Sequence, residues 1–237
     1  MGRKLIRMNH IVCLKHGDKY GVEYVNRLYS MCKRNSNVPF NFACITEDTN
    51  GMNPDIKHIP LPRYKLSGWW FKPWVLSNEF PLKGTILFLD LDLVIINNID
   101  NLWTYNPKDF CIIRDFNRCL VANWDKFNSS VFRFESGQYR HVWDNLVNNL
   151  EQVKRHPGDQ DWIYNQIKTS YSFWPDQWIK SYKWEVRNRS ELIKDEYGRR
   201  FKTIADPKIE RETSILVFHG EPNPHQVQDP VIVDNWR

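Results

Sequence analysis

The chain has 237 residues, of which 41% are hydrophobic and 26% are charged. This balance excludes an intrinsically disordered chain, which would be less apolar, and a membrane-embedded helix bundle, which would carry fewer charges. Lys and Arg number 33 against 28 Asp and Glu, and the resulting net charge of +5 suits a small anionic ligand without indicating nucleic acid. No Gly/Ser-rich or Pro-rich linker and no internal repeat divides the sequence, so we expect a single domain over 1–237.

The cysteines and the apolar stretches bear on the cellular compartment. Five cysteines, an odd number without a C-x-x-C pair, indicate neither a disulfide framework nor a thiolate zinc site. The first residues lack the apolar core of a signal peptide, and the longest apolar stretch, 86–96, contains two aspartates and is too short to cross a bilayer as a helix. We therefore expect a cytoplasmic protein without a transmembrane segment, for which peripheral membrane contact stays open.

The first elements follow the order strand, helix, strand. Residues 9–14 form a short apolar strand, 20–34 carry apolar residues at helical spacing, and 40–45 return to a strand pattern. This order is typical of a βαβ unit with parallel strands. An aromatic segment follows at 69–80, where Pro73 can open a short helix.

Residues 85–96 form a nearly unbroken apolar run, as expected for a parallel strand in the middle of a sheet that is covered on both faces. Further along the chain we predict strands at 110–113, 130–134 and 214–218, an amphipathic helix at 138–153, and a helix at 159–167. The segment 171–201 is charged and aromatic without a clear period, which predicts a variable, loop-rich excursion. The elements together predict an α/β fold.

The central apolar run contains the first chemical signal, Asp90-Leu-Asp92. In a strand these two carboxylates point to the same side, and an ionised carboxylate in apolar surroundings is costly unless a cation accompanies it. A divalent metal such as Mg²⁺ or Mn²⁺, which prefers oxygen ligands, would meet this need. An arginine such as Arg114, or a strand end that reaches solvent, would also do so.

One enzyme class that places D-x-D after an apolar strand is the haloacid dehalogenase-like phosphatases. Asp90 would be the nucleophile of such a Mg²⁺-dependent enzyme, and Val94 satisfies the last position of that motif. That class, however, normally carries the motif on its first strand, whereas a βαβ unit precedes Asp90 here. The class also needs a later acidic loop, which 158–161 matches poorly.

The other class is the nucleotide-sugar glycosyltransferases. The chain resembles the GT-A fold, and in particular glycosyltransferase family 8, the glycogenin and lipopolysaccharide galactosyltransferase group. The resemblance rests on the order of motifs over about 9–225: the early βαβ unit, Asp90-Leu-Asp92, Asn128-Ser-Ser130, Asp159-Gln160-Asp161 and His219-Gly220. It implies a GT-A α/β/α sandwich with a central, mostly parallel sheet.

The resemblance also implies an activity. The enzyme would transfer a sugar from a nucleoside diphosphate donor, expected to be a UDP-sugar, to a hydroxyl of a glycan, a lipid-linked or a protein acceptor, with retention of the anomeric configuration favoured. Asp90, Asp92 and His219 would bind Mn²⁺ or Mg²⁺, and Asp90 would also contact the donor ribose. The catalytic group would be Asp159, Gln160 and Asp161 beside the anomeric carbon, although N-capping of a helix by Asp159 also explains that acid.

Five further residues are candidates for donor binding. Tyr20 follows the first strand and can stack on uracil, and Thr46 and Asp48, after the second strand, can bind the base or ribose. The family pattern implies a donor contact for Asn128. It usually also places a lysine before the last proline of the loop after His-Gly, where this chain has Asn223; we therefore predict that Lys72 contacts the diphosphate.

A nonenzymatic protein is the remaining alternative. Eleven tryptophans and a basic charge permit binding of single-stranded nucleic acid by stacking, or binding of sugars on flat apolar faces. No nucleic-acid-binding signature accompanies them, so we expect no nucleic-acid partner. The motifs of dinucleotide oxidoreductases, P-loop NTPases, zincins and α/β-hydrolases are also missing from the sequence.

Overall fold

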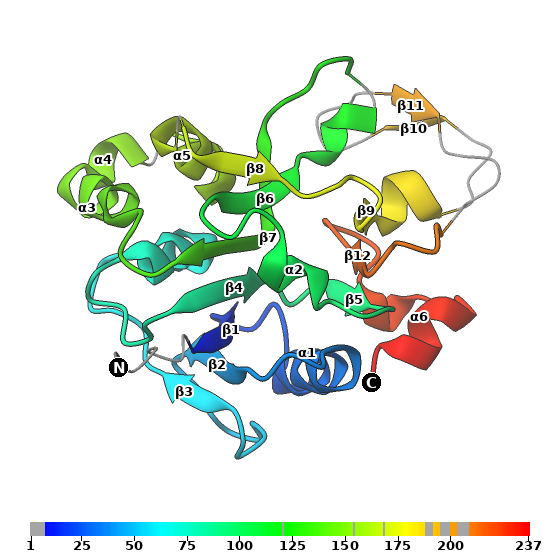
Figure 1. The fold of residues 1–237 in the computed structure, drawn as a ribbon, viewed down its shortest axis with the longest axis horizontal. Helices are drawn as coiled ribbons and strands as arrows, with labels where there is room; N and C mark the ends of the chain where they lie inside the picture. Colours follow the sequence, from blue (N-terminus) through cyan, green and yellow to red (C-terminus); the bar gives the residue numbers. More distant parts are fainter. Residues whose placement is uncertain are drawn as a thin grey trace, which may run out of the picture.

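A seven-stranded sheet forms the centre of the molecule (Figure 1). The structure is a computed structural model that describes residues 8–119, 121–153, 155–167, 169–187, 192–194, 200–202 and 209–237. The strands lie in the order β3-β2-β1-β4-β7-β6-β8. Their bounds are Asn9–Lys15 (β1), Asn41–Thr46 (β2), Lys57–Ile59 (β3), Thr85–Leu89 (β4), Phe110–Arg114 (β6), Phe127–Glu135 (β7) and Tyr171–Phe173 (β8).

The pairing confirms the predicted, mostly parallel sheet. Four of the six neighbouring pairs are parallel, and only β7 runs antiparallel to its neighbours, β4 and β6. The helix α1 (Val22–Asn35) connects the parallel strands β1 and β2, so the βαβ unit is confirmed. β4 lies in the middle of the sheet, as the apolar run predicted.

Both faces of the sheet are covered, as an α/β/α sandwich requires. Along β1 and β4, alternate side chains enter two different cores, because successive residues of a strand point to opposite faces. Leu87 and Leu89 pack in the core that contains α1, whereas Ile86 and Phe88 pack in the core on the other face. That second core is closed by α3 (Arg140–Asn148), α5 (Asp159–Gln166) and the 3₁₀ helix η1 (Gly68–Leu76).

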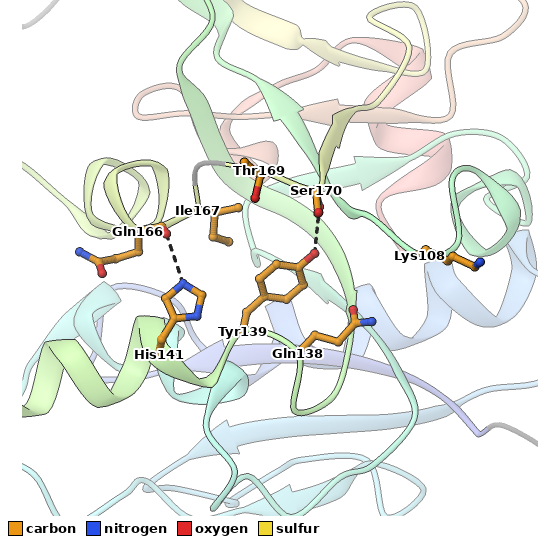
Figure 2. Close-up of a pocket in the computed structure, with 8 residues that line it drawn as sticks. All are labelled: Lys108, Gln138, Tyr139, His141, Gln166, Ile167, Thr169 and Ser170. Carbon is orange, nitrogen blue, oxygen red and sulfur yellow. Dashed lines mark hydrogen bonds between the residues drawn. The ribbon is translucent and has the colours of Figure 1, made fainter.

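A hollow of about 430 Å³ lies beside α3, the end of α5 and the start of β8 (Figure 2). Two of its polar side chains bond to backbone oxygens of the same lining: the Tyr139 hydroxyl donates to the carbonyl oxygen of Ser170 at 2.9 Å, and His141 Nε2 donates to that of Gln166 at 3.2 Å. No carboxylate lines it, and none of the residues that the sequence singled out is found there. We therefore do not treat this hollow as the functional site.

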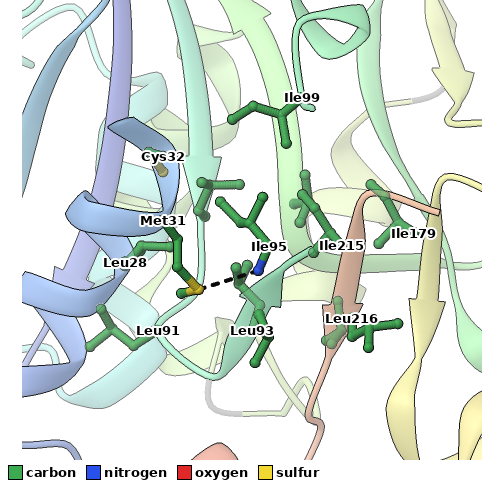
Figure 3. Packing of buried hydrophobic residues seen from close by; sticks show 14 of the residues in the cluster. Leu28, Met31, Cys32, Leu91, Leu93, Ile95, Ile99, Ile179, Ile215 and Leu216 are labelled. Atoms are coloured by element: carbon green, nitrogen blue, oxygen red, sulfur yellow. Dashed lines mark hydrogen bonds between the residues drawn. The ribbon is translucent and has the colours of Figure 1, made fainter. Parts of the chain in front are cut away.

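A second sheet, of three strands, lies beside the first. Its order is β5-β12-β9, with β5 at Leu93–Ile95, β12 at Ile215–Val217 and β9 at Ile179–Ser181. Figure 3 shows its apolar residues packed against α1, where Met31 Sδ accepts a hydrogen bond from the backbone N–H of Ile95 at 3.3 Å. The contact joins the small sheet to the α1 core.

This arrangement corrects the prediction of one strand over 85–96. The chain leaves β4 at Asp90, turns through Leu91, and enters β5 in the other sheet after Asp92. Backbone hydrogen bonds hold both sides of the turn: Asp90 N donates to Ser130 O, and Phe218 N donates to Asp92 O, each at 2.8 Å. Because β4 and β5 are both buried, both strands are apolar in sequence, and the sequence alone does not show that they belong to different sheets.

Three other predicted elements differ from the structure. Pro73 lies inside η1 and does not open it; because proline has no N–H, one hydrogen bond of the 3₁₀ helix is missing there. The helix predicted at 138–153 is divided into α3 and α4 (Leu150–Val153). The segment 171–201 contributes β8 and β9 to the two sheets, so its described part is more regular than predicted, while 188–191 and 195–199 lie outside the described residues.

The remaining elements are short: α2 (Asn101–Thr104), η2 (Phe116–Cys119), the π-helical turn η3 (Tyr182–Val186), β10 (Leu192–Lys194), β11 (Arg200–Lys202), η4 (Pro224–Gln226) and α6 (Pro230–Asn235). Among the described residues, none of the helices has the length and apolar character that a bilayer crossing needs. All five cysteines are free thiols, as their number and spacing predicted.

Candidate functional site

A pocket of about 380 Å³ opens where β1 and β4 end, between η1, the start of β7, the start of α5 and the end of β12. The carboxyl ends of parallel strands are where α/β sheets usually bind ligands. Eight of the eleven site residues predicted from the sequence line this one pocket: Tyr20, Lys72, Asp90, Asp92, Asn128, Asp159, Gln160 and His219. The sequence motifs, which are spread over two hundred residues, therefore belong to one site.

Lys72 is at the centre of one side of the pocket. It is only 4% exposed, and its Nζ lies 2.8 Å from Asp90 Oδ1 and 3.4 Å from Asp159 Oδ2. Burial alone would lower the pKa of Lys72, but the two carboxylates outweigh it and raise that pKa, so the ammonium stays charged. The ammonium already has two anionic partners, and it therefore holds the two acids in place; this is a different role from the predicted diphosphate contact.

An irregularity in β7 supplies the rest of that network. Ile112 of β6 pairs with Phe132, while the next residue, Ile113, pairs with Asn128, so β7 has three more residues than β6 between these pairs. Bulges of this kind redirect strand groups and are common beside functional sites. Here Lys72 Nζ donates to both Ser129 Oγ at 3.1 Å and Ser129 O at 3.3 Å.

Asp159 is held by this network and does not cap its helix. Gly158 occupies the N-cap of α5 and makes no side-chain cap, so the N-capping interpretation is wrong. Asp159 is 6% exposed, and its Oδ2 accepts a hydrogen bond from Ser129 Oγ at 2.6 Å. Burial raises the pKa of Asp159, against the opposing effect of Lys72. Gln160, the next residue, also lines the pocket.

Asp92 lies on the other side of the pocket, where no buried cation of the described part of the chain pairs with it. Its Oδ2 accepts a hydrogen bond of 3.0 Å from the hydroxyl of Tyr20. Burial, followed by repulsion from Asp90, raises the pKa of Asp92 to about 6, although Lys19, Tyr20 and Lys72 oppose the shift. Asp92 is therefore a carboxylate whose negative charge is incompletely balanced by the protein.

The pairing of β12 with β5 brings His219 close to Asp92. β12 runs antiparallel to β5 with Val217 opposite Leu93, and this register brings the residues after β12 to the D-x-D turn. His219 Nε2 lies 2.6 Å from Ser181 Oγ, and the ring stacks on Phe116. Burial, followed by Lys183, lowers the pKa of His219 to about 3, so the imidazole is neutral at physiological pH, which is the form that binds metals.

The pocket offers oxygen and nitrogen donors of the kind that a divalent ion needs. Two carboxylates and a neutral imidazole suit Mn²⁺ or Mg²⁺ in kind, and Asp92 carries a charge that such an ion would balance. In their present rotamers each ligand has a protein partner: Lys72 for Asp90, Tyr20 for Asp92 and Ser181 for His219. Within the described ranges, no three His, Cys, Asp or Glu side chains gather closely enough to hold an ion. The shared pocket is thus present, while the closed three-ligand cluster stays a prediction.

Three predicted site residues do not line the pocket. Thr46 is fully buried, and its hydroxyl donates to the backbone oxygen of Asp48 at 3.1 Å in a local turn. Asp48 is exposed and accepts a hydrogen bond from the N–H of Asn50 at 2.9 Å. Asp161 is half-buried in the first turn of α5, outside the pocket lining. Turn formation and helix geometry account for these three residues.

The pocket also contains five polar or aromatic residues that we did not predict as site residues: His16, Lys19, Trp69, Ser129 and Ser130. His16 and Lys19 follow β1 at the carboxyl edge of the sheet, and that position was a usable signal. His16 Nδ1 lies 3.0 Å from Glu47 Oε1, which ties the loop after β1 to the loop after β2. Ser129 is adjacent to Asn128 but acquires its role only through the β7 bulge.

Solved structures share this fold. The chain superposes on an active-site mutant of LgtC with a TM-score of 0.65 at 13% identity, covering 93% of this chain and 90% of that one. The galactosyltransferase LgtC in complex with donor and acceptor sugar analogues gives a TM-score of 0.60 at the same identity and coverage.

Two larger proteins are also similar. The glycosyltransferase GlyE of Streptococcus pneumoniae matches with a TM-score of 0.60 at 16% identity over 91% of this chain and 56% of its own. The bifunctional glycosyltransferase WbbM matches with a TM-score of 0.61 at 11% identity over 94% of this chain and 48% of its own. No protein-family model matches the sequence, and no curated protein matches it. The resemblance to the GT-A fold is therefore confirmed at the level of fold, which this chain shares with glycosyltransferases.

Proposed function

We propose that this protein is a glycosyltransferase that moves a sugar from a nucleoside diphosphate donor, a UDP-sugar, to a hydroxyl acceptor. One observation carries the proposal: the D-x-D turn, the start of α5 and the His-Gly end of β12 line a single pocket at the carboxyl edge of the sheet. The fold shared with LgtC, GlyE and WbbM supports it. A glycan, a lipid-linked or a protein hydroxyl would be the acceptor.

Asp90, Asp92 and His219 are the residues that would hold Mn²⁺ or Mg²⁺. When bound there, such an ion would neutralise the negative charge that develops on the leaving diphosphate. Lys72 fixes the Asp90 carboxylate from the protein side, and Phe218 N fixes the backbone oxygen of Asp92. The ligands thus start from anchored positions, which lowers the cost of ordering them when the donor binds.

At the α5 side of the pocket, Asp159 and Gln160 would orient the donor sugar. Asp159 is held by Lys72 and Ser129, so its carboxylate is suited to accept hydrogen bonds from sugar hydroxyls. An inverting reaction would need a carboxylate that takes the acceptor proton as a base. Asp161 does not line the pocket, and Asp159 lines it but is already bonded to Lys72 and Ser129. For this reason we favour retention of the anomeric configuration.

Calorimetric titration of UDP tests the proposal. We expect Mn²⁺-dependent binding by the wild type, loss of that binding in Asp92→Ala, and weaker binding in His219→Ala. Asp144→Ala, which removes an exposed carboxylate of α3 outside the pocket, is the matched control and should bind like the wild type. Unchanged affinity in both pocket variants would contradict the proposal.

His219→Ala and one further variant, Asp90→Asn, separate the alternatives. A haloacid dehalogenase-like phosphatase would hydrolyse p-nitrophenyl phosphate with Mg²⁺, would lose this activity in Asp90→Asn, and would be indifferent to His219. A single-strand-binding protein would bind oligonucleotides without metal and with a steep dependence on salt. We expect neither behaviour.

A further inference from the structure

Trp69 differs from every other tryptophan of the chain. All eleven lie within the described residues, and Trp69 alone is exposed, with 54% of its surface accessible; the others are buried or half-buried. Its indole makes no hydrogen bond, ring contact or cation–π contact with the described part of the chain. A large amphipathic ring in this condition has its faces and its N–H available for a ligand.

The position of Trp69 is fixed by η1. A 3₁₀ helix has three residues per turn, so side chains three apart lie on the same side, and Trp69 and Lys72 accordingly both line the pocket. Lys72 is inside, paired with Asp90 and Asp159, while Trp69 stands at the exposed end of the same helix face. The buried remainder of η1 anchors this ring at the pocket.

The indole also adjoins the start of α5. Its Nε1 lies 3.8 Å from the point where a Cβ on Gly158 would stand, and Gly158 immediately precedes Asp159 and Gln160. A side chain at 158 would stand against the ring, and glycine keeps that side of it open. Trp69 therefore belongs to the Asp159 side of the pocket, and Tyr20 belongs to the Asp92 side.

We propose that Trp69 is a stacking platform for a pyranose ring of the acceptor, so that the acceptor is a glycan. Pyranoses of the β-gluco and β-galacto series carry axial C–H groups on one face, and this apolar face can lie on an indole while the sugar hydroxyls stay hydrated or bond to Nε1. The residue would set acceptor choice without touching the nucleotide. This inference rests on the proposed function, because it assigns the second substrate of the same pocket.

The test measures sugar contact and nucleotide binding separately. Saturation-transfer NMR is recorded with methyl β-lactoside, methyl β-cellobioside and methyl β-chitobioside on wild type, Trp69→Phe, Trp69→Ala and the control Val233→Ala. Val233 is 51% exposed on α6 and does not line the pocket. UDP affinity with Mn²⁺ is measured by calorimetry on the same four proteins.

We expect saturation of the ring C–H protons of at least one glycoside in the wild type, Trp69→Phe and Val233→Ala. In Trp69→Ala the glycoside Kd should rise about tenfold, the equivalent of about 1.4 kcal/mol, while UDP affinity stays within about twofold. Absence of glycoside binding in the wild type, or equal binding by Trp69→Ala, would overturn the platform. Loss of UDP affinity in Trp69→Ala would show that the ring supports the nucleotide and would also overturn it. Failure of the wild type to bind UDP at all would instead contradict the proposed function.

Discussion

Asp90 and Asp92 line the same pocket two residues apart, yet the charge of Asp90 is paired with a cation of the protein and that of Asp92 is not paired with one among the described residues. Asp90 lies 2.8 Å from the buried ammonium of Lys72. The same ammonium also contacts Asp159 and Ser129. Asp92 faces the hydroxyl of Tyr20, a neutral donor. The first side is an internally compensated ion network, and the second holds a carboxylate whose pKa is raised to about 6 by burial and by Asp90.

This difference separates a structural task from a binding task. An ion network whose charges are paired within the protein is stable without a ligand. A buried charge without a counter-ion is instead stabilised when a cation binds. Lys72 is therefore expected to position Asp90 and Asp159, and Asp92 is expected to carry the charge that a bound metal would balance.

The largest effect is expected for Lys72→Met. Removal of the ammonium leaves the buried Asp159 and the half-buried Asp90 without their cation, and breaking a buried ion pair such as that of Lys72 and Asp159 typically costs about 3 to 5 kcal/mol. Urea denaturation should show a loss of this size in the free energy of unfolding. The exposed Lys65→Met serves as control, and a loss below about 1 kcal/mol for Lys72→Met would mean that the network is not structural.

Asp92→Asn should separate binding from stability. Mn²⁺-dependent UDP affinity is expected to fall about 100-fold, the equivalent of about 2.7 kcal/mol, because a charged ligand of the ion is lost. The metal-free protein should be no less stable than the wild type at pH 7, since the substitution removes repulsion from Asp90. Lower stability together with unchanged UDP affinity would reverse the roles assigned to the two sides.

The pH dependence of metal-free stability gives a third test. The pKa of Asp92 is raised from 3.8 to about 6 in the folded state, so the folded protein holds this proton more tightly than the unfolded chain does. Asp92 therefore contributes stability below pH 4 that is lost as the pH rises through 6, by about 1 to 3 kcal/mol. The difference in unfolding free energy between wild type and Asp92→Asn should change by this amount across that window, and a flat difference would refute the shift.

Ser181→Ala should have a smaller effect on metal binding. Ser181 Oγ accepts a hydrogen bond from Trp184 N at 3.0 Å and lies 2.6 Å from His219 Nε2, so it orients the imidazole. Loss of such an orienting partner typically weakens metal affinity about tenfold. Calorimetric titration of Mn²⁺ measures this change, and an unaltered Kd would show that the His219 ring is held by Phe116 and Trp184 without help from the serine.

The smallest effect is expected for Tyr20→Phe. It removes one hydrogen bond to Asp92, worth about 1 kcal/mol, and keeps the aromatic ring in the pocket. Because that bond lowers the pKa of Asp92, the pH window described for the wild type should move upward in this variant. A downward movement would mean that the Tyr20 hydroxyl does not stabilise the carboxylate.

The sequence predicted the fold and most of the pocket because both depend on local patterns. An apolar strand that ends in Asp90, a helix that follows β1, and a short strand before His219 can each be identified from neighbouring residues. The rule that parallel strands end at one edge then places these groups together. This is why residues from such distant parts of the sequence were predicted for one site.

What could not be predicted depends on tertiary pairing. The partners of Lys72 come from the D-x-D turn, β7 and α5, and no local pattern distinguishes a buried lysine in an ion network from an exposed lysine that awaits a phosphate. Asp159 resembled a helix cap because its position in the sequence suits one. Thr46 and Asp48 follow a strand end as binding residues would, but they bond to each other in a turn.

The hydrogen bond from Phe218 N to Asp92 O means that the identity of the third metal-ligand candidate is set by strand alignment. Side chains of a strand alternate between faces, so a shift of β12 by one position along β5 would present Phe218 or Gly220 where the imidazole now stands. A single-residue insertion or deletion between Ser214 and Val217 would then remove the imidazole from the pocket although the sequence would still encode every residue that lines it.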